Sequence, residues 1–252
     1  MADQAMTQAA APAPLPRPVP PLLSFVAGYV DSITFLALFG FFAAQVTGSF
    51  VVAAAHLVVD DRGVAAKMLA IPAFMVGAGI AAAIIIVRPG GKKSSLPLVF
   101  SLETLLLSGF VALMLYSWPV TNPDSWRGAI AGLLSAAAMG VQSALVRLLL
   151  RGVPQTNVMT GNSTQLAIDA TEILYAWLRP RRVAADPALA AQVAEAQKRF
   201  ATVFAVLAGF LIGALLGAIA YAFAGPWSAC LAILVVAGLI AWTAKRGGSD
   251  PV

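Results

Sequence analysis

The sequence predicts an all-α membrane protein in which about six crossing helices and two short or re-entrant helices form one bundle. Three observations predict this fold class. The chain of 252 residues is 60% hydrophobic and 11% charged, whereas soluble domains carry about 25% charged residues. Its apolar runs reach the roughly 20 residues that one bilayer crossing needs. Two Thr-Gly pairs, at 47–48 and 160–161, interrupt these runs with polar sequence.

The first elements follow from composition. Residues 1–21 form an Ala/Pro-rich tail, which we expect to be disordered because proline removes backbone donors and favours extended conformations. The apolar run from 22 to about 59 contains the first Thr-Gly pair and is barely long enough for two crossings. The helices predicted after it cover, in chain order, 64–87, 96–117, 127–150, the unusually polar 153–178, 200–223 and 227–243.

The charged segment 179–199 predicts a helix at the membrane interface. Asp186-Pro187 is a typical helix start, and Glu195 and Arg199 lie four residues apart on one helix face. Residues 245–252 form a short tail after the last apolar run. The span 22–244 is therefore expected to be a single transmembrane domain.

Two pairs of similar sequences divide this domain into halves at about 22–117 and about 127–244. Val30-Asp31-Ser32 corresponds to Val141-Gln142-Ser143, and Thr47-Gly48-Ser49 corresponds to Thr160-Gly161-Asn162. The two offsets are nearly equal (142 − 31 = 111 and 160 − 47 = 113), so an insertion of two residues aligns the halves. We interpret the domain as two internal repeats.

The basic residues distinguish between two topologies. If every helical piece crosses, one side carries 11 Lys and Arg residues and the other carries 5 of the 16. If the two Thr-Gly segments enter and return on the same side, only Arg62, Lys67 and Arg127 lie outside and the remaining 13 lie inside. The positive-inside rule favours the second topology, with both termini in the cytoplasm. Each half then has an odd number of crossings, so the repeats are inverted, as in many transporters.

Thr47-Gly48-Ser49 and Thr160-Gly161-Asn162 are typical of helix starts, because Thr, Ser and Asn side chains accept hydrogen bonds from free N–H groups and Gly permits a sharp entry. In the re-entrant topology both helix N-termini would face each other near the bilayer midplane. Their partial positive charge suits an anion or a polar neutral molecule. The alternative is that these small residues serve close packing at helix crossings.

Two carboxylates lie deep in predicted crossings. Asp31 is about ten residues into the first span, and Glu103 is about seven residues into the span 96–117. An intramembrane carboxylate costs several kcal/mol, so it is usually paired, neutral or functional. Both are therefore candidates for proton carriers. Asp31 is the stronger candidate because its counterpart, Gln142, is also polar, while Glu103 could extend to the interface.

Other polar residues have two interpretations each. Gln45 and Gln165 flank the two Thr-Gly pairs and could either line a polar path or bond backbone groups freed by the breaks. Asp169 and Glu172, on one face of the polar helix, are expected to pair with Arg179 or Arg147. His56 is expected to make an ordinary interfacial hydrogen bond.

Gly209, Gly213 and Gly217 form a ridge that permits close approach of another helix, either in the same chain or in a second copy of a homo-oligomer. With a single histidine and a single cysteine, Cys230, neither a metal centre nor a Cys-His enzyme is expected. No cofactor is expected, and the net charge of +5 reflects basic residues at helix ends rather than nucleic-acid binding.

The residues also resemble a known family. Gly28-Tyr29-Val30-Asp31-Ser32-Ile33-Thr34-Phe35, Thr47-Gly48-Ser49 and Val158-Met159-Thr160-Gly161-Asn162-Ser163-Thr164-Gln165 resemble the YoaK-like family, a family of unknown function among bacterial inner-membrane proteins. The resemblance covers about 22–244, with Ser49 where the family pattern leads us to expect Asn. It implies a multi-pass protein of the bacterial inner membrane and supplies no substrate.

The functional hypothesis is a transporter or channel for a small polar or anionic solute, with its path between the two Thr-Gly half-helices. The residues expected to line it are Asp31, Gln45, Thr47, Gly48, Ser49, Glu103, Gln142, Thr160, Gly161, Asn162 and Gln165. The alternative hypothesis is a membrane protein that transports nothing and serves interaction or assembly.

Overall fold

The computed structural model describes residues 18–59, 62–88, 91–150 and 152–247. This part of the chain is helical and contains no strand, which confirms the all-α class. The helices in chain order are α1 (Val19–Ala37), α2 (Val46–Val59), α3 (Val64–Met68), α4 (Ala70–Val87), α5 (Gly91–Ser117), α6 (Trp126–Leu149), α7 (Met159–Leu178), α8 (Pro180–Ala185), α9 (Pro187–Ala224), the 3₁₀ helix η1 (Gly225–Ala229) and α10 (Cys230–Gly247).

The described helices include several that are long and apolar enough to cross a membrane. These are Val19–Ala37, Val64–Val87, Ser95–Ser117 and Trp126–Leu149, together with the 57-residue span Pro187–Thr243 that contains α9 and α10. Val46–Val59 is apolar but shorter than these. The chain is thus a membrane-type helical protein, as its composition predicts.

Several boundaries differ from the sequence-based expectation. The start of α1 is Val19 rather than residue 22, because Pro20 and Pro21 occupy its first turn, where proline needs no intrahelical N–H partner. The rest of the tail expected at 1–21, residues 1–17, lies outside the described residues. The tail expected at 245–252 is helical as far as Gly247, and 248–252 lie outside the described residues.

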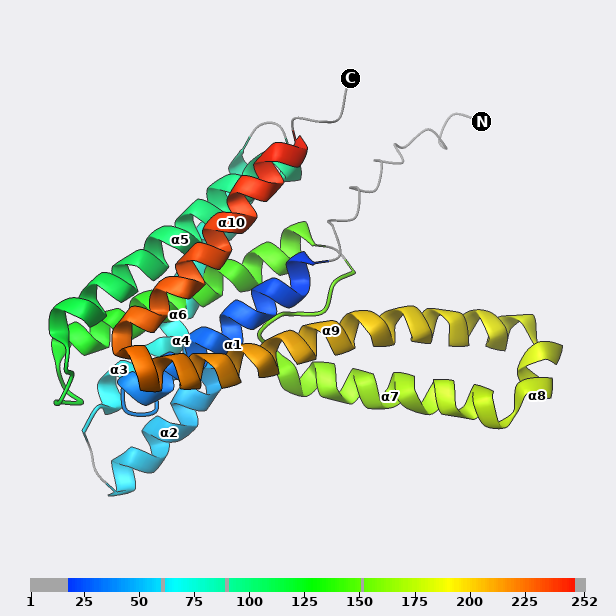
Figure 1. Cartoon of the computed structure of the whole chain (residues 1–252), viewed down its shortest axis with the longest axis horizontal. Coiled ribbons are helices and arrows are strands. Elements are labelled where there is room, and N and C mark those ends of the chain that lie inside the picture. The colour runs from blue at the N-terminus through cyan, green and yellow to red at the C-terminus, as the bar shows by residue number, and fades with distance from the viewer. Residues whose placement is uncertain (1–17, 60–61, 89–90, 151, 248–252) are drawn as a thin grey trace.

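The helix start predicted at Asp186-Pro187 is confirmed, but the expectation of a separate helix within 179–199 is wrong. Asp186 accepts hydrogen bonds from the backbone N–H groups of Ala188 and Leu189, and so begins α9, which continues for 38 residues to Ala224. Its first half packs against α7, and the short α8 joins the two helices. Figure 1 shows this hairpin of α7, α8 and α9 extending away from the other helices.

Two close helix pairs form the centre of the bundle, α1 with α9 and α4 with α6. The ridge of Gly209, Gly213 and Gly217 lies on the α1 backbone, and a Cβ atom at Gly213 would overlap the carbonyl oxygen of Phe25. The sequence left open whether the ridge's partner lies in the same chain, and here α1 lies against all three glycines. A Cβ atom at Gly77 of α4 would likewise overlap the α6 backbone.

The remaining helices complete the bundle around these pairs. Helix α5 packs against α6 and α10, and α2 lies against α3 and α4. The starts of α1 and α5 and the ends of α6 and α10 gather toward one end of the bundle, while α2 and the loop 118–125 lie toward the other (Figure 1).

Candidate functional site

The first Thr-Gly segment returns to the middle of α1. After α1 ends, Phe39 and Gly40 adopt left-handed backbone conformations with φ of 54° and 83° and reverse the chain. The carboxylate of Asp31 then accepts backbone N–H bonds from Ala43 (2.8 Å), Ala44 (2.6 Å) and Gln45 (3.1 Å). Successive N–H groups that converge on one anion form a strong charge-assisted nest. Asp31, which is only 3% exposed, therefore fixes the start of α2 inside the bundle.

Ser49 fixes the same segment from the other side. Its hydroxyl accepts the N–H of Phe42 at 2.7 Å and donates to the carbonyl oxygen of Phe42 at 2.9 Å. Gly48 lies against the ring of Phe42, and a Cβ atom there would come within 2.9 Å of it. Thr47 is exposed. The Thr-Gly-Ser sequence thus begins a helix, as predicted, but Ser49 rather than Thr47 holds the turn.

The second segment returns to α1 in a related way. The Gln142 amide, fully buried in α6, donates from Nε2 to the hydroxyl of Thr156 (2.9 Å) and to the carbonyl oxygen of Leu23 (3.0 Å). Ser24 of α1 donates to the carbonyl oxygen of Thr156 at 2.9 Å. The Asn162 amide donates to the carbonyl oxygen of Gln155 at 2.7 Å. These bonds fix the chain just before α7 against both α1 and α6.

The positions that the sequence comparison pairs therefore make similar contacts. Asp31 holds the segment that precedes α2, and Gln142 holds the segment that precedes α7. Ser49 and Asn162 each bond the residue seven positions earlier. In this role the hydroxyl of Ser49 replaces the amide that the family pattern predicts. Thr160 and Gly161 are exposed at the start of α7, as Thr47 is at the start of α2.

Both segments lie along one face of α1. Ser24 and Asp31 are seven residues apart, which is two turns of an α-helix and roughly 10 Å of rise. Ala27 lies between them on this face, is fully buried, and has only a methyl side chain. The structure thus brings the two Thr-Gly segments near each other through α1, with Asp31 and Gln142 at their anchor points.

A cleft of about 320 Å³ opens beside the first segment. Its polar wall consists of Asp31, Ser32 and Gln45, and the rest is apolar, with Phe210 and Ala214 contributed by α9. Its described lining contains no Lys or Arg side chain. Of the predicted path residues, Asp31 and Gln45 line this cleft.

Glu103 lies apart from these contacts. It is fully buried in α5, and neither carboxylate oxygen has a hydrogen-bond partner within the described structure. Gln142 Oε1 and Asn157 Oδ1 are likewise buried acceptors without a donor there. Asn157 begins the polar stretch 157–165 that contains the second Thr-Gly pair, but it was not among the residues expected to line the path.

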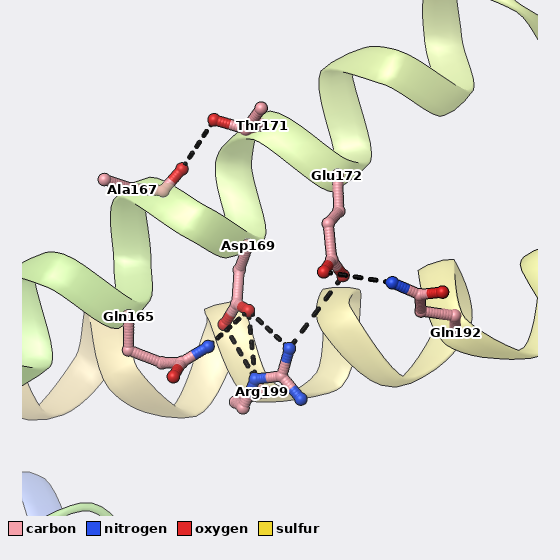
Figure 2. Close-up of polar contacts among 7 residues, drawn as sticks. All are labelled: Gln165, Ala167, Asp169, Thr171, Glu172, Gln192 and Arg199. Atoms are coloured by element: carbon pink, nitrogen blue, oxygen red, sulfur yellow. Dashed lines mark hydrogen bonds and ion pairs between the residues drawn. The ribbon is translucent and has the colours of Figure 1, made fainter.

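Gln165, Asp169 and Glu172 belong to the hairpin rather than to the cleft (Figure 2). Asp169 is fully buried and binds Arg199 of α9, with Nη2 at 2.6 Å and Nε at 2.9 Å. Gln165 donates to Asp169 at 2.8 Å, and Gln192 donates to Glu172 at 3.2 Å. The predicted pairing of Asp169 and Glu172 with an arginine is confirmed. The expected partners, Arg179 and Arg147, are wrong, because the hairpin aligns α7 with the start of α9.

Two further contacts lie at the α2 end of the bundle. His56 Nδ1 is 3.1 Å from the carbonyl oxygen of Arg62, which is the ordinary hydrogen bond expected of it. Lys67 is nearly fully buried and donates to the carbonyl oxygen of Gly63, whose N–H donates to Asp124. Sequence reasoning missed this contact, since a lysine at a helix end gives no signal of burial.

The fold and these buried polar anchors define a membrane-type helical protein in which the segments that precede α2 and α7 are held against α1. A family model matches residues 21–243, and the chain belongs to that family, described as "Protein of unknown function (DUF1275)". The predicted membership of a family of unknown function is thereby confirmed. No curated protein and no solved structure matches the chain.

Proposed function

We propose that this protein is a transporter or channel of the bacterial inner membrane for a small polar solute, and not an enzyme. The observation that carries the proposal is the position of the two Thr-Gly helix starts, which buried Asp31 and Gln142 hold along one face of α1. Non-helical backbone at membrane depth is tolerated where it is enclosed by protein or lines a cavity. Such broken segments often form the solute sites of transporters.

The proposed topology has α1, α4, α5, α6, the second half of α9 and α10 as crossings. The segment 38–59 enters and leaves on the outside, and 150–178 enters and leaves on the cytoplasmic side. Residues 43–45 bond to Asp31 in the middle of α1, and Thr156 bonds to Gln142 in α6. These contacts support a re-entrant path for both segments. The shared anchor pattern and the reciprocal pairing of α1 with α9 and α4 with α6 support two inverted repeats. Both termini are then cytoplasmic.

The cleft favours a polar neutral solute over an anion. The N–H groups of 43–45, which an anion would need, already bind the Asp31 carboxylate. The Gln45 amide and the Ser32 hydroxyl remain as hydrogen-bonding groups in the wall. A polar solute could exchange its water hydrogen bonds for these, whereas an anion would meet a carboxylate of like charge.

The test is swelling of proteoliposomes that contain the purified protein. The vesicles are mixed with urea or glycerol as neutral probes, and with sodium formate or sodium nitrate as anionic probes. We expect swelling in a neutral probe to exceed that of protein-free vesicles. Gln45→Leu should slow it by about tenfold, since loss of one hydrogen bond in the path costs roughly 1 to 1.5 kcal/mol.

Gln192→Leu is the matched control, because Gln192 lies exposed on the hairpin and away from the cleft. Faster swelling only in formate or nitrate would reject the neutral solute in favour of an anion. Equal swelling with and without protein in every probe would favour the second function, a membrane interaction protein. The exposed apolar side chains of the hairpin, among them Ile168, Leu174 and Trp177, favour that alternative.

A further inference from the structure

Glu103 combines complete burial with the lack of any hydrogen-bond partner among the described residues. Its side chain lies in α5, where Val99, Phe100 and Leu107, one turn away on either side, are also buried. The nearby hydroxyls of Thr104 and Ser108 donate to backbone carbonyl oxygens of α5 and not to Glu103. Both carboxylate oxygens therefore lie in a buried layer without a hydrogen-bond donor among the described residues.

Among the described side chains, none that is charged pairs with Glu103 from the helices packed against α5, which are α6, α10, α4 and η1. In the described side chains of these helices, the titratable groups are Arg127, Arg147 and Cys230. Arg127 lies over Tyr116, which is roughly 20 Å from Glu103 along α5. Arg147 is exposed at the opposite end of α6, and Cys230 adjoins η1 beside the far end of α5.

An ionised carboxylate in such a layer would lack both water and a counter-charge. Burial of an unpaired ion costs far more than burial of a neutral polar group, and a buried acid avoids that cost by keeping its proton. Asp31 presents the opposite case, because three backbone N–H groups satisfy its carboxylate. The bundle therefore contains one buried carboxyl group with three hydrogen-bond donors, at Asp31, and one without a donor among the described residues, at Glu103.

We propose that Glu103 is a membrane-embedded proton-binding site, occupied at neutral pH, whereas the Asp31 carboxyl group serves as an anchor for backbone N–H groups. The ligand of this site is a single proton, which leaves the carboxyl group only when α5 separates from α6 or α10 far enough to admit water. The use of this proton to drive solute movement rests on the proposed transport function. The proton site itself does not.

Infrared spectroscopy of the full chain at pH 7 tests the proposal, with dodecyl maltoside as detergent because it has no carbonyl group. A protonated carboxylic acid absorbs above the amide bands, and a carboxylate does not. We expect such a band in the wild type, its loss in Glu103→Gln, and its retention in Asp31→Asn. A spectrum without the band, or a band lost in Asp31→Asn and kept in Glu103→Gln, would overturn the assignment.

A second measurement covers the case in which Glu103→Gln folds poorly. The wild type should lose thermal stability as the pH is raised, because ionised Glu103 would then be unpaired in the core. Glu103→Leu should show no such loss from this site, and an unchanged pH dependence in this variant would overturn the proposal. If the infrared band is present and no probe causes swelling, the proposed function fails and the proton site stands.

Discussion

Asp31 and Gln142 occupy corresponding places but hold their segments by different chemistry. Asp31 receives three backbone N–H bonds on one carboxylate, whereas Gln142 donates its amide to a hydroxyl and to a carbonyl group. The carboxylate thus satisfies three donors that the reversal of the chain leaves without helical partners. We assign Asp31 a positioning role at the start of α2 rather than the proton-carrying role that its depth in the sequence suggests.

Replacement of Asp31 tests this role. Asp31→Asn keeps the shape of the side chain but replaces one acceptor oxygen with a donor that faces backbone N–H groups. We expect the free energy of unfolding to fall by about 2 to 4 kcal/mol, in line with hydrogen bonds to a buried charged group. Unfolding by sodium dodecyl sulfate in mixed micelles measures the change. Ser32→Ala, beside Asp31 in the cleft, is the control, and equal stability of both variants would contradict the positioning role.

Replacement of Glu103 should not lower the free energy of unfolding as replacement of Asp31 does. Glu103→Leu removes two buried oxygens without partners and substitutes apolar atoms of similar volume. Because such replacements are often neutral or stabilising, we expect stability in mixed micelles to be unchanged or about 1 kcal/mol higher. A loss of more than about 3 kcal/mol, typical of a broken buried ion pair, would show that Glu103 has a counter-charge.

The pairing of α1 with α9 depends on small residues at the element scale. At Gly213 the carbonyl oxygen of Phe25 occupies the place of a Cβ atom, whereas at Gly238 of α10 nothing lies within 4 Å. Alanine usually stabilises a helix interior by about 1 kcal/mol relative to glycine. The local environment therefore decides the sign of each substitution.

We expect Gly213→Ala to destabilise the protein in mixed micelles, because α1 and α9 must move apart to admit the methyl group. Gly238→Ala should be neutral or slightly stabilising. Thermal unfolding in detergent provides an independent measure. Similar effects of the two substitutions would mean that α1 does not approach α9 as closely as the glycine contacts require.

The hairpin of α7 and α9 depends on Arg199. Its guanidinium contacts both Asp169 and Glu172, and Asp169 is fully buried. Arg199→Leu would leave that buried carboxylate without its cation. We therefore expect faster amide hydrogen exchange in α7 and at the start of α9, with α4 and α6 unchanged.

Gln192→Leu is the control for the hairpin, since it removes only an exposed contact with Glu172. Hydrogen exchange measured by mass spectrometry locates the effect. Unchanged exchange of α7 in Arg199→Leu would show that apolar packing alone maintains the hairpin.

The sequence predicted the helix starts well, because Gly48 and Gly161 and their polar neighbours interrupt apolar runs. It also singled out Asp31 and Gln142, each of which anchors a segment before one of these helices. It could not identify the partners of Asp31, because backbone N–H groups leave no side-chain signal. The length of α9 was missed for a related reason. Its first half is charged and therefore resembles an interfacial segment. Its packing against α7 depends on the contact of Arg199 with Asp169, thirty residues earlier, which the sequence does not reveal.

At the scale of the whole molecule, α2 and α7 run in different directions from the segments that Asp31 and Gln142 anchor (Figure 1). Helix α2 runs toward the end that contains the loop 118–125, and α7 runs into the hairpin. A topology with both segments re-entrant accounts for this arrangement and leaves only Arg62, Lys67 and Arg127 outside. The proposed solute path and inverted repeats both depend on it.

Labelling of single cysteines in intact cells tests this topology most directly. In a Cys230→Ser background, cysteines replace Val59 after α2, Thr121 after α5 and Gly152 after α6, with Ala185 of α8 as a cytoplasmic control in either topology. With a membrane-impermeant maleimide, we expect labelling at Val59 and Thr121 and none at Gly152 or Ala185 until the membrane is permeabilised. Labelling of Gly152 from outside, with Val59 and Thr121 protected, would mean that both Thr-Gly segments cross the membrane, and would contradict the account.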